Sequence, residues 1–152
     1  MRILVQRVKK ASVTIDGRVN GKIDKGVLAF VGFCEDDKEE YILPMAQKMA
    51  GLRIFEDADG KMNLSLADIG GRVLAISQFT LYADCSHGRR PSFISALKPD
   101  AAERYYNIFI KALDDINGTK TEKGIFGADM KVELLNDGPV TIMLDSDQII
   151  KK

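Results

Sequence analysis

Two short segments carry the side chains whose types and spacing suit chemistry. Residues 77–84 read Ser-Gln-Phe-Thr-Leu-Tyr-Ala-Asp, which places hydroxyls and an amide at the end of an apolar run. Residues 136–141 read Asn-Asp-Gly-Pro-Val-Thr, with a Gly-Pro step between two apolar runs. Polar groups where a strand meets a loop are typical of binding sites. From spacing alone, Thr80 is equally typical of a strand residue, Gln78 of a surface amide, and Gly138-Pro139 of a turn.

The usual sets of catalytic side chains are missing from the sequence. His87 is the single histidine, so a Ser-His-Asp or Cys-His triad would have to run through a polar loop, where a solvated histidine is the simpler interpretation. One histidine with Cys34 and Cys85 does not make a zinc site of the usual type. The phosphate-binding patterns GxxxxGK[ST] and GxGxxG are absent. Chemistry is therefore expected to depend on main-chain groups, hydroxyls and the substrate itself.

In this order and at this separation, the two segments resemble the D-aminoacyl-tRNA deacylases, whose signatures are SQFTL and NxGPVT. Residues 1–8 (MRILVQRV) and 88–93 (GRRPSF) are similar to that family as well, so the resemblance covers nearly the whole chain. It implies a homodimeric esterase that cleaves D-amino acids from the 3′-terminal adenosine of tRNA. It also implies that the reaction needs no metal and no organic cofactor.

The resemblance implies roles for the first segment. Ser77, Gln78, Phe79 and Thr80 would line the site that holds the ester. The backbone N–H groups of Phe79 and Thr80 would form an oxyanion hole for its carbonyl. The Thr80 hydroxyl would orient substrate or water, since a lone threonine without a base is a poor nucleophile. Phe79 and Met130 would sandwich the terminal adenine, although a methionine at the start of a strand is more often part of a core.

The second segment would select the chirality of the substrate. In the family resembled, the Gly138-Pro139 bond is cis and reaches into the active site of the other subunit, where two carbonyl oxygens leave no room for an L side chain. Glycine has no side chain to exclude, so Gly-tRNA is an expected substrate too. Arg7 matches the arginine that braces this loop; without the resemblance it would be an outward strand residue. Arg89 and Arg90 are either solvated surface or a contact with the phosphates of the tRNA acceptor end.

Two alternatives stay open. One is a dimeric protein of the same fold that binds RNA ends or small molecules and has lost hydrolysis. The nearer one is a related tRNA editing protein with an altered Gly-Pro geometry and a different substrate. The intact SQFT and NDGPVT motifs argue against both.

The composition predicts a single domain spanning residues 1–152. A hydrophobic content of 45% in 152 residues is enough for one core. Lys plus Arg and Asp plus Glu both count 22, so any RNA contact should be local. No apolar stretch reaches about 18 residues and the start lacks a signal peptide's apolar centre, which predicts a soluble, cytoplasmic protein without membrane contact. Two cysteines without a CxxC motif are typical of reduced thiols.

The elements that must position the two segments follow from hydrophobic periodicity. Asp37 and Glu40 predict a capping box for a helix that ends at Gly51. A second helix is predicted from about Pro99 to Asn117. The predicted order is strands, helix, strands, helix and strands, which indicates an α+β domain with largely antiparallel sheets. The family resemblance implies in addition a barrel-like β core with two main helices packed outside. Strands are predicted at residues 2–8, 11–15, 26–33, 72–81, 130–135 and 140–144.

Overall fold

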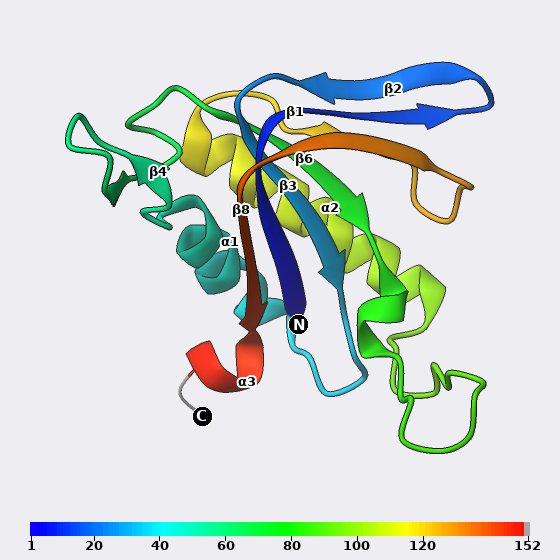
Figure 1. Ribbon diagram of the computed structural model, residues 1–152. Helices are drawn as coiled ribbons and strands as arrows, with labels where there is room; N and C mark the ends of the chain where they lie inside the picture. The colour runs from blue at the N-terminus through cyan, green and yellow to red at the C-terminus, as the bar shows by residue number, and fades with distance from the viewer. Residues whose placement is uncertain (151–152) are drawn as a thin grey trace.

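A strongly curved sheet forms the centre of the protein, whose computed structural model describes residues 1–150 (Figure 1). The strand order is β2-β1-β3-β6-β7, and β8 pairs with β1 along most of its length. The strands are β1 (Arg2–Ile15), β2 (Arg18–Ile23), β3 (Gly26–Gly32), β4 (Phe55–Glu56), β5 (Met62–Leu64), β6 (Arg72–Ser77), β7 (Glu122–Lys123) and β8 (Lys131–Asp145). The helices are α1 (Ile42–Ala50), α2 (Pro99–Asn117) and α3 (Ser146–Ile149), with 3-10 helices η1 (Glu39–Tyr41) and η2 (Phe79–Tyr82).

The sheet nearly closes into a barrel. β2 lies against β7, where the Asn20 amide donates a hydrogen bond of 2.7 Å to the carbonyl of Lys123. The predicted α+β fold with a barrel-like sheet and two main helices is confirmed. The sheet is mixed rather than largely antiparallel, because β6 runs parallel to both β3 and β7. The crossover through α1 and the β4–β5 hairpin returns the chain in the same direction, which a parallel pair requires.

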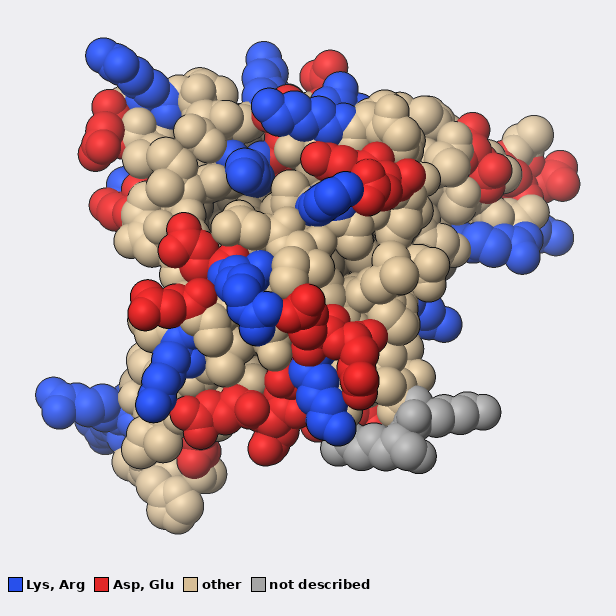
Figure 2. Space-filling view, turned by 180° about the vertical axis from the view of Figure 1, so that it is seen from behind, with Lys and Arg blue, Asp and Glu red and all other residues tan. Residues whose placement is uncertain are grey.

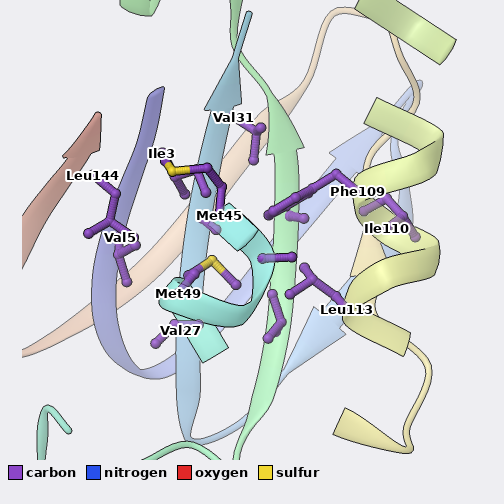
Figure 3. Packing of buried hydrophobic residues seen from close by; sticks show 14 of the residues in the cluster. Ile3, Val5, Val27, Val31, Met45, Met49, Phe109, Ile110, Leu113 and Leu144 are labelled. Atoms are coloured by element: carbon purple, nitrogen blue, oxygen red, sulfur yellow. The ribbon is translucent and has the colours of Figure 1, made fainter. Parts of the chain in front are cut away.

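Two apolar clusters fill the molecule, one on each side of β3. The larger lies between the sheet and the helices, where Met45 and Met49 of α1 and Phe109 and Leu113 of α2 point toward the strands (Figure 3). Because β3 is covered on both faces, it reads as a continuous apolar run, as predicted for a central strand. The second cluster, inside the barrel, consists of Val8, Ala11, Val13, Ile23, Leu28, Leu74 and Ile76.

The two helices begin differently. α2 starts with Pro99 in its first turn and stops at Gly118, whose φ of 63° is left-handed, so its predicted limits are confirmed. The predicted capping box at α1 is wrong, since the residue before the helix makes no side-chain cap. Asp37 is instead buried, and it accepts a hydrogen bond of 2.8 Å from the backbone N–H of Cys34 and pairs with the α-ammonium group of Met1.

Three predictions of strand limits are wrong. The strands predicted at residues 2–8 and 11–15 are one strand, β1. The strand predicted to reach residue 81 ends at Ser77, and residues 79–82 form η2. The two strands predicted around Gly138-Pro139 are one strand, β8, so this step is an irregularity inside a strand rather than a turn. The register of the β1–β8 pair shifts at Arg7, where residues 137–140 of β8 lie opposite this single residue. Both flanks of the irregularity pair with the same strand, which hydrophobic periodicity cannot show.

Candidate active site

A pocket of about 630 Å³ opens at the carboxyl ends of the parallel strands β3 and β6. Figure 1 shows the end of β6, η2 and the start of α2 at this corner of the molecule. The remaining wall comes from residues 126–130, which precede β8. Since the carboxyl ends of parallel strands meet at one edge, segments distant in the sequence converge here.

Tight contact with β3 positions η2 at this edge. The N–H of Gln78 donates to the carbonyl of Val31 at 2.8 Å, and the N–H of Leu81 donates to the carbonyl of Gln78 at 3.3 Å. A Cβ atom on Gly32 would lie 2.6 Å from the Gln78 carbonyl oxygen, so only glycine permits this approach. The first donors of a helical turn have no acceptor within it. The N–H groups of Phe79 and Thr80 therefore have no acceptor within η2.

Four of the predicted site residues lie together around the pocket. Ser77, Gln78, Phe79 and Met130 all line it. Thr80 is exposed and is not part of the lining, but its hydroxyl accepts a hydrogen bond of 2.6 Å from the Gln78 amide. The structure thus connects the threonine hydroxyl to the pocket wall through Gln78.

An aromatic pair forms one side of the pocket. The rings of Phe79 and Phe93 meet edge to face, with centroids 5.1 Å apart, and Phe79 stays 55% exposed. Met130 is half-buried against the apolar cluster inside the barrel while it also lines the pocket. Sequence reasoning missed Phe93 as a wall residue, although it ends the GRRPSF segment. Two backbone hydrogen bonds between Asp84 and Ser92, of 2.8 and 2.9 Å, fix the residue before Phe93 and so position its ring.

The loop that these bonds close carries the basic pair and the histidine. Arg89 and Arg90 are exposed at its end. The hydroxyl and backbone N–H of Ser86 bond to the Asp84 carboxylate and lower its pKa. His87 is exposed, with Nδ1 2.7 Å from the Ser86 hydroxyl, and in the described chain no acid binds its ring to complete a triad. On the face seen in Figure 2, positive and negative side chains are interspersed without a continuous basic field.

Arg7 holds the irregular segment of β8. It is buried, and its guanidinium donates to the carbonyl of Asp137 at 2.9 Å and to the carbonyl of Ile54 at 2.7 Å. The Gly138-Pro139 bond is cis, and Gly138 has a φ of 127°. A Cβ atom on Gly138 would lie 2.9 Å from Nη2 of Arg7. Gly138 and Pro139 are exposed, and neither they nor Arg7 line the pocket. The two signature segments therefore lie at separate places on one chain.

Residues 1–150 contain neither a cluster of metal ligands nor a membrane-spanning helix. No group of three His, Cys, Asp or Glu side chains there is placed to hold a metal ion. No helix in this part of the chain is long and apolar enough to cross a membrane. Cys34, which is half-buried, and the exposed Cys85 carry free thiols.

Comparison with known proteins finds relatives that span nearly the whole chain. The family model described as D-Tyr-tRNA(Tyr) deacylase matches residues 4–145. A D-aminoacyl-tRNA deacylase from Halothermothrix orenii is 55% identical over 148 residues, 97% of this chain and 99% of that protein. Another from Thermosipho africanus is 50% identical over 149 residues, 98% of this chain and 99% of that protein.

Solved structures share the fold. The c-Myc DNA unwinding element binding protein superposes with a TM-score of 0.89 at 37% identity, covering 95% of this chain and 98% of the other. A probable eukaryotic D-amino acid tRNA deacylase superposes with a TM-score of 0.83 at 16% identity, covering 94% and 97%, which shows the fold alone. From the family model and these relatives we conclude that this chain belongs to the D-Tyr-tRNA(Tyr) deacylase family.

Proposed function

We propose that this protein is a D-aminoacyl-tRNA deacylase, which hydrolyses the ester between a D-amino acid and the 3′-terminal adenosine of tRNA. The observation that carries the proposal is the first signature segment. Ser77, Gln78 and Phe79 of this segment line a pocket of about 630 Å³ at the point where β6 passes into η2. Membership of the family supports the same activity. The substrate places the protein in the cytoplasm, where tRNA is charged.

The N–H groups of Phe79 and Thr80 bind the oxyanion that develops when water attacks the ester carbonyl. Removing one such donor typically costs about 10²–10³ in rate. The Gln78 amide orients the Thr80 hydroxyl, which positions substrate or water. Ser77 supplies a further hydroxyl at the end of β6. The acidic residue in the lining of this pocket, Asp129, has its carboxylate paired with Nζ of Lys131 at 2.9 Å. We therefore assign the orientation or activation of the water to the 2′-hydroxyl of the terminal ribose.

The terminal adenine of the tRNA lies between Phe79 and Met130. Both side chains line the same pocket, and the edge-to-face contact with Phe93 restrains the ring of Phe79. Unstacked bases bind to aromatic side chains in this way in many RNA-binding proteins. Arg89 and Arg90 on the adjoining loop contact phosphates of the acceptor end.

A second copy of the chain completes the site. β8 pairs with β1 on one edge, and among residues 1–150 no strand covers its other edge. Leu134, Leu135 and Met143 of β8 are 37%, 48% and 46% exposed. A long unpaired strand with apolar side chains is typical of a surface that associates. In the homodimer, Gly138-Pro139 of one subunit, braced by Arg7, reaches the pocket of the other and excludes L side chains.

The test is hydrolysis of matched aminoacyl-tRNAs. Release of tyrosine from D-Tyr-tRNA but not from L-Tyr-tRNA supports the activity. Release from neither favours a protein of the same fold that binds tRNA ends without hydrolysis, and release of an L residue favours an editing protein with another substrate.

Gly-tRNA tests how chirality is selected. Selection by exclusion predicts cleavage of Gly-tRNA and D-Ala-tRNA but not of L-Ala-tRNA, although glycine and L-alanine differ by only one methyl group. An attractive pocket discriminates one methyl by only about 1–3 kcal/mol. Intact Gly-tRNA beside cleaved D-Ala-tRNA would show that the D side chain is recognised positively, which contradicts exclusion.

A further inference from the structure

Residues of the three neighbouring strands β3, β1 and β8 lie side by side where η2 packs against the sheet. Arg2 of β1 pairs with Gly32 of β3 on one side and with Asp145 of β8 on the other. Directly paired residues project on the same face of a sheet. A Cβ atom on Gly32 would lie 3.2 Å from Cβ of Leu81 and 3.5 Å from the ring of Tyr82. The last two residues of η2 therefore occupy the space that a side chain at Gly32 would take, beside Arg2.

Arg2 links these elements through its guanidinium group. Nε donates to the Asp145 carboxylate at 2.9 Å, and Nη1 donates to the carbonyl of Leu81 at 2.9 Å. The guanidinium carbon lies 4.6 Å from the centroid of the Tyr82 ring, a cation–π geometry. The other oxygen of Asp145 accepts the backbone N–H of Asp147 at 3.0 Å, so the anchoring carboxylate is itself held. Arg2 thus connects the end of β8 to the end of η2.

A helix as short as η2 needs such a link. It comprises four residues and has no side-chain cap at its start, and isolated single turns are unstable in water. Its first end is tied to the sheet by the bond from Gln78 to Val31. Its last carbonyls lack donor partners within the helix, and a cation is favourable there. The Arg2 bond to the Leu81 carbonyl, at 2.9 Å, ties the opposite end, where the Ser95 hydroxyl donates a longer bond of 3.2 Å to the carbonyl of Tyr82.

We propose that Arg2 is a positioning residue for hydrolysis, which orients the N–H groups of Phe79 and Thr80 by clamping the far end of η2 to β8. The inference rests on the role proposed above for these two groups. Without the clamp, the far end of η2 keeps only the longer, exposed bond from Ser95 and shifts relative to its fixed start at Gln78. Displacements of about 1 Å cost on the order of 10²-fold in rate. We expect Arg2→Ala to lower kcat about 10- to 100-fold. The change in KM should be smaller than the change in kcat, because Met130 and Phe93 lie outside η2 and only Phe79 moves with it.

The experiment measures kcat and KM for D-Tyr-tRNA together with the melting temperature of each variant. Arg2→Lys keeps the charge but cannot bond to Asp145 and to the Leu81 carbonyl in a fork, so we expect intermediate activity. Asp145→Asn weakens the anchor and should also lower kcat. Combined with Arg2→Ala, it should add almost nothing, since both substitutions break one link.

Arg104→Ala is the matched control. Arg104 pairs with Glu39, and its guanidinium carbon lies 5.0 Å from the centroid of the Tyr105 ring, so it has the same chemistry without contact to η2. We expect wild-type kcat for this variant. A folded Arg2→Ala protein with kcat within twofold of wild type overturns the inference, even if its melting temperature is lowered. Full activity in both Arg2→Lys and Asp145→Asn overturns it as well. A wild-type protein that hydrolyses nothing overturns the proposed function itself.

Discussion

Replacing Arg7 with lysine tests the brace that holds the irregular segment of β8. Arg7 donates two hydrogen bonds to backbone carbonyls, those of Asp137 and Ile54, from a buried position. The carboxylates of Asp137 and Glu56 lie 3.8 and 4.0 Å from the same guanidinium. Lysine preserves the charge, but its single ammonium group cannot reproduce the fork that reaches both carbonyls.

The expected loss follows from one missing bond. A hydrogen bond from a charged donor contributes about 1.5–3 kcal/mol to the free energy of unfolding, and the carbonyl that loses its donor stays inside the protein. Arg7→Lys should therefore lower the free energy of unfolding by about 1.5–3 kcal/mol. In a chain of this size that corresponds to a melting temperature lower by roughly 3–12 °C. Because the bond to Asp137 lies next to Gly138, we also expect the ratio of D-Tyr-tRNA to L-Tyr-tRNA hydrolysis to fall.

Urea unfolding gives the free energy, and parallel deacylation assays give the ratio. Arg53→Lys is the control: its guanidinium binds the carbonyl of Asn63 at 2.8 Å in an exposed setting, where we expect a change within about 0.5 kcal/mol. An Arg7→Lys protein as stable as this control would refute the reasoning. Lower stability with an unchanged ratio of D-Tyr-tRNA to L-Tyr-tRNA hydrolysis would show that Arg7 stabilises the fold without affecting chiral selection.

Three further predictions concern the reaction and the core. Thr80→Ala should lower the deacylation rate by about 10²–10³-fold or less, and an acyl group found on Thr80 would contradict its positioning role. D-aminoacyl-tRNA ending in 2′-deoxyadenosine should bind but resist cleavage, and an undiminished rate would exclude help from the 2′-hydroxyl. Burial raises the pKa of Tyr106, whose hydroxyl donates to the Ala75 carbonyl at 2.8 Å. The buried, neutral Tyr106 hydroxyl makes its full contribution to the free energy of unfolding below the unfolded-state pKa of about 10. That contribution is lost as the pH rises above this value. Tyr106→Phe should cost about 1 kcal/mol at neutral pH and flatten the alkaline decline of unfolding free energy; an unchanged slope would contradict this.

Local signals sufficed where a structural element depends on its own residues. Pro99 and Gly118 delimit α2 because proline fits the first turn and glycine the left-handed stop. The apolar run of β3 predicted a strand covered on both faces. For the site, the first signature segment named Ser77, Gln78 and Phe79, which the structure places around one pocket.

Other features depend on partners distant in the sequence, so periodicity could not reveal them. Asp37 is a plausible helix cap by spacing, but the α-ammonium group of Met1 competes for it. The strand through residue 81 is broken because Gln78 bonds to Val31 and the following turn packs over Gly32.

The sequence by itself determined the family, the limits of α2 and the chemical inventory of the site, since side-chain types and local backbone preferences act over a few residues. The tertiary structure alone decided the parallel return of β6, the bulge opposite Arg7 and the link from Arg2 to Leu81. Each of these joins segments more than 40 residues apart in the printed chain. Such contacts form only when burial of the two apolar clusters brings the segments together, and until then nothing in either segment's own pattern distinguishes its partner.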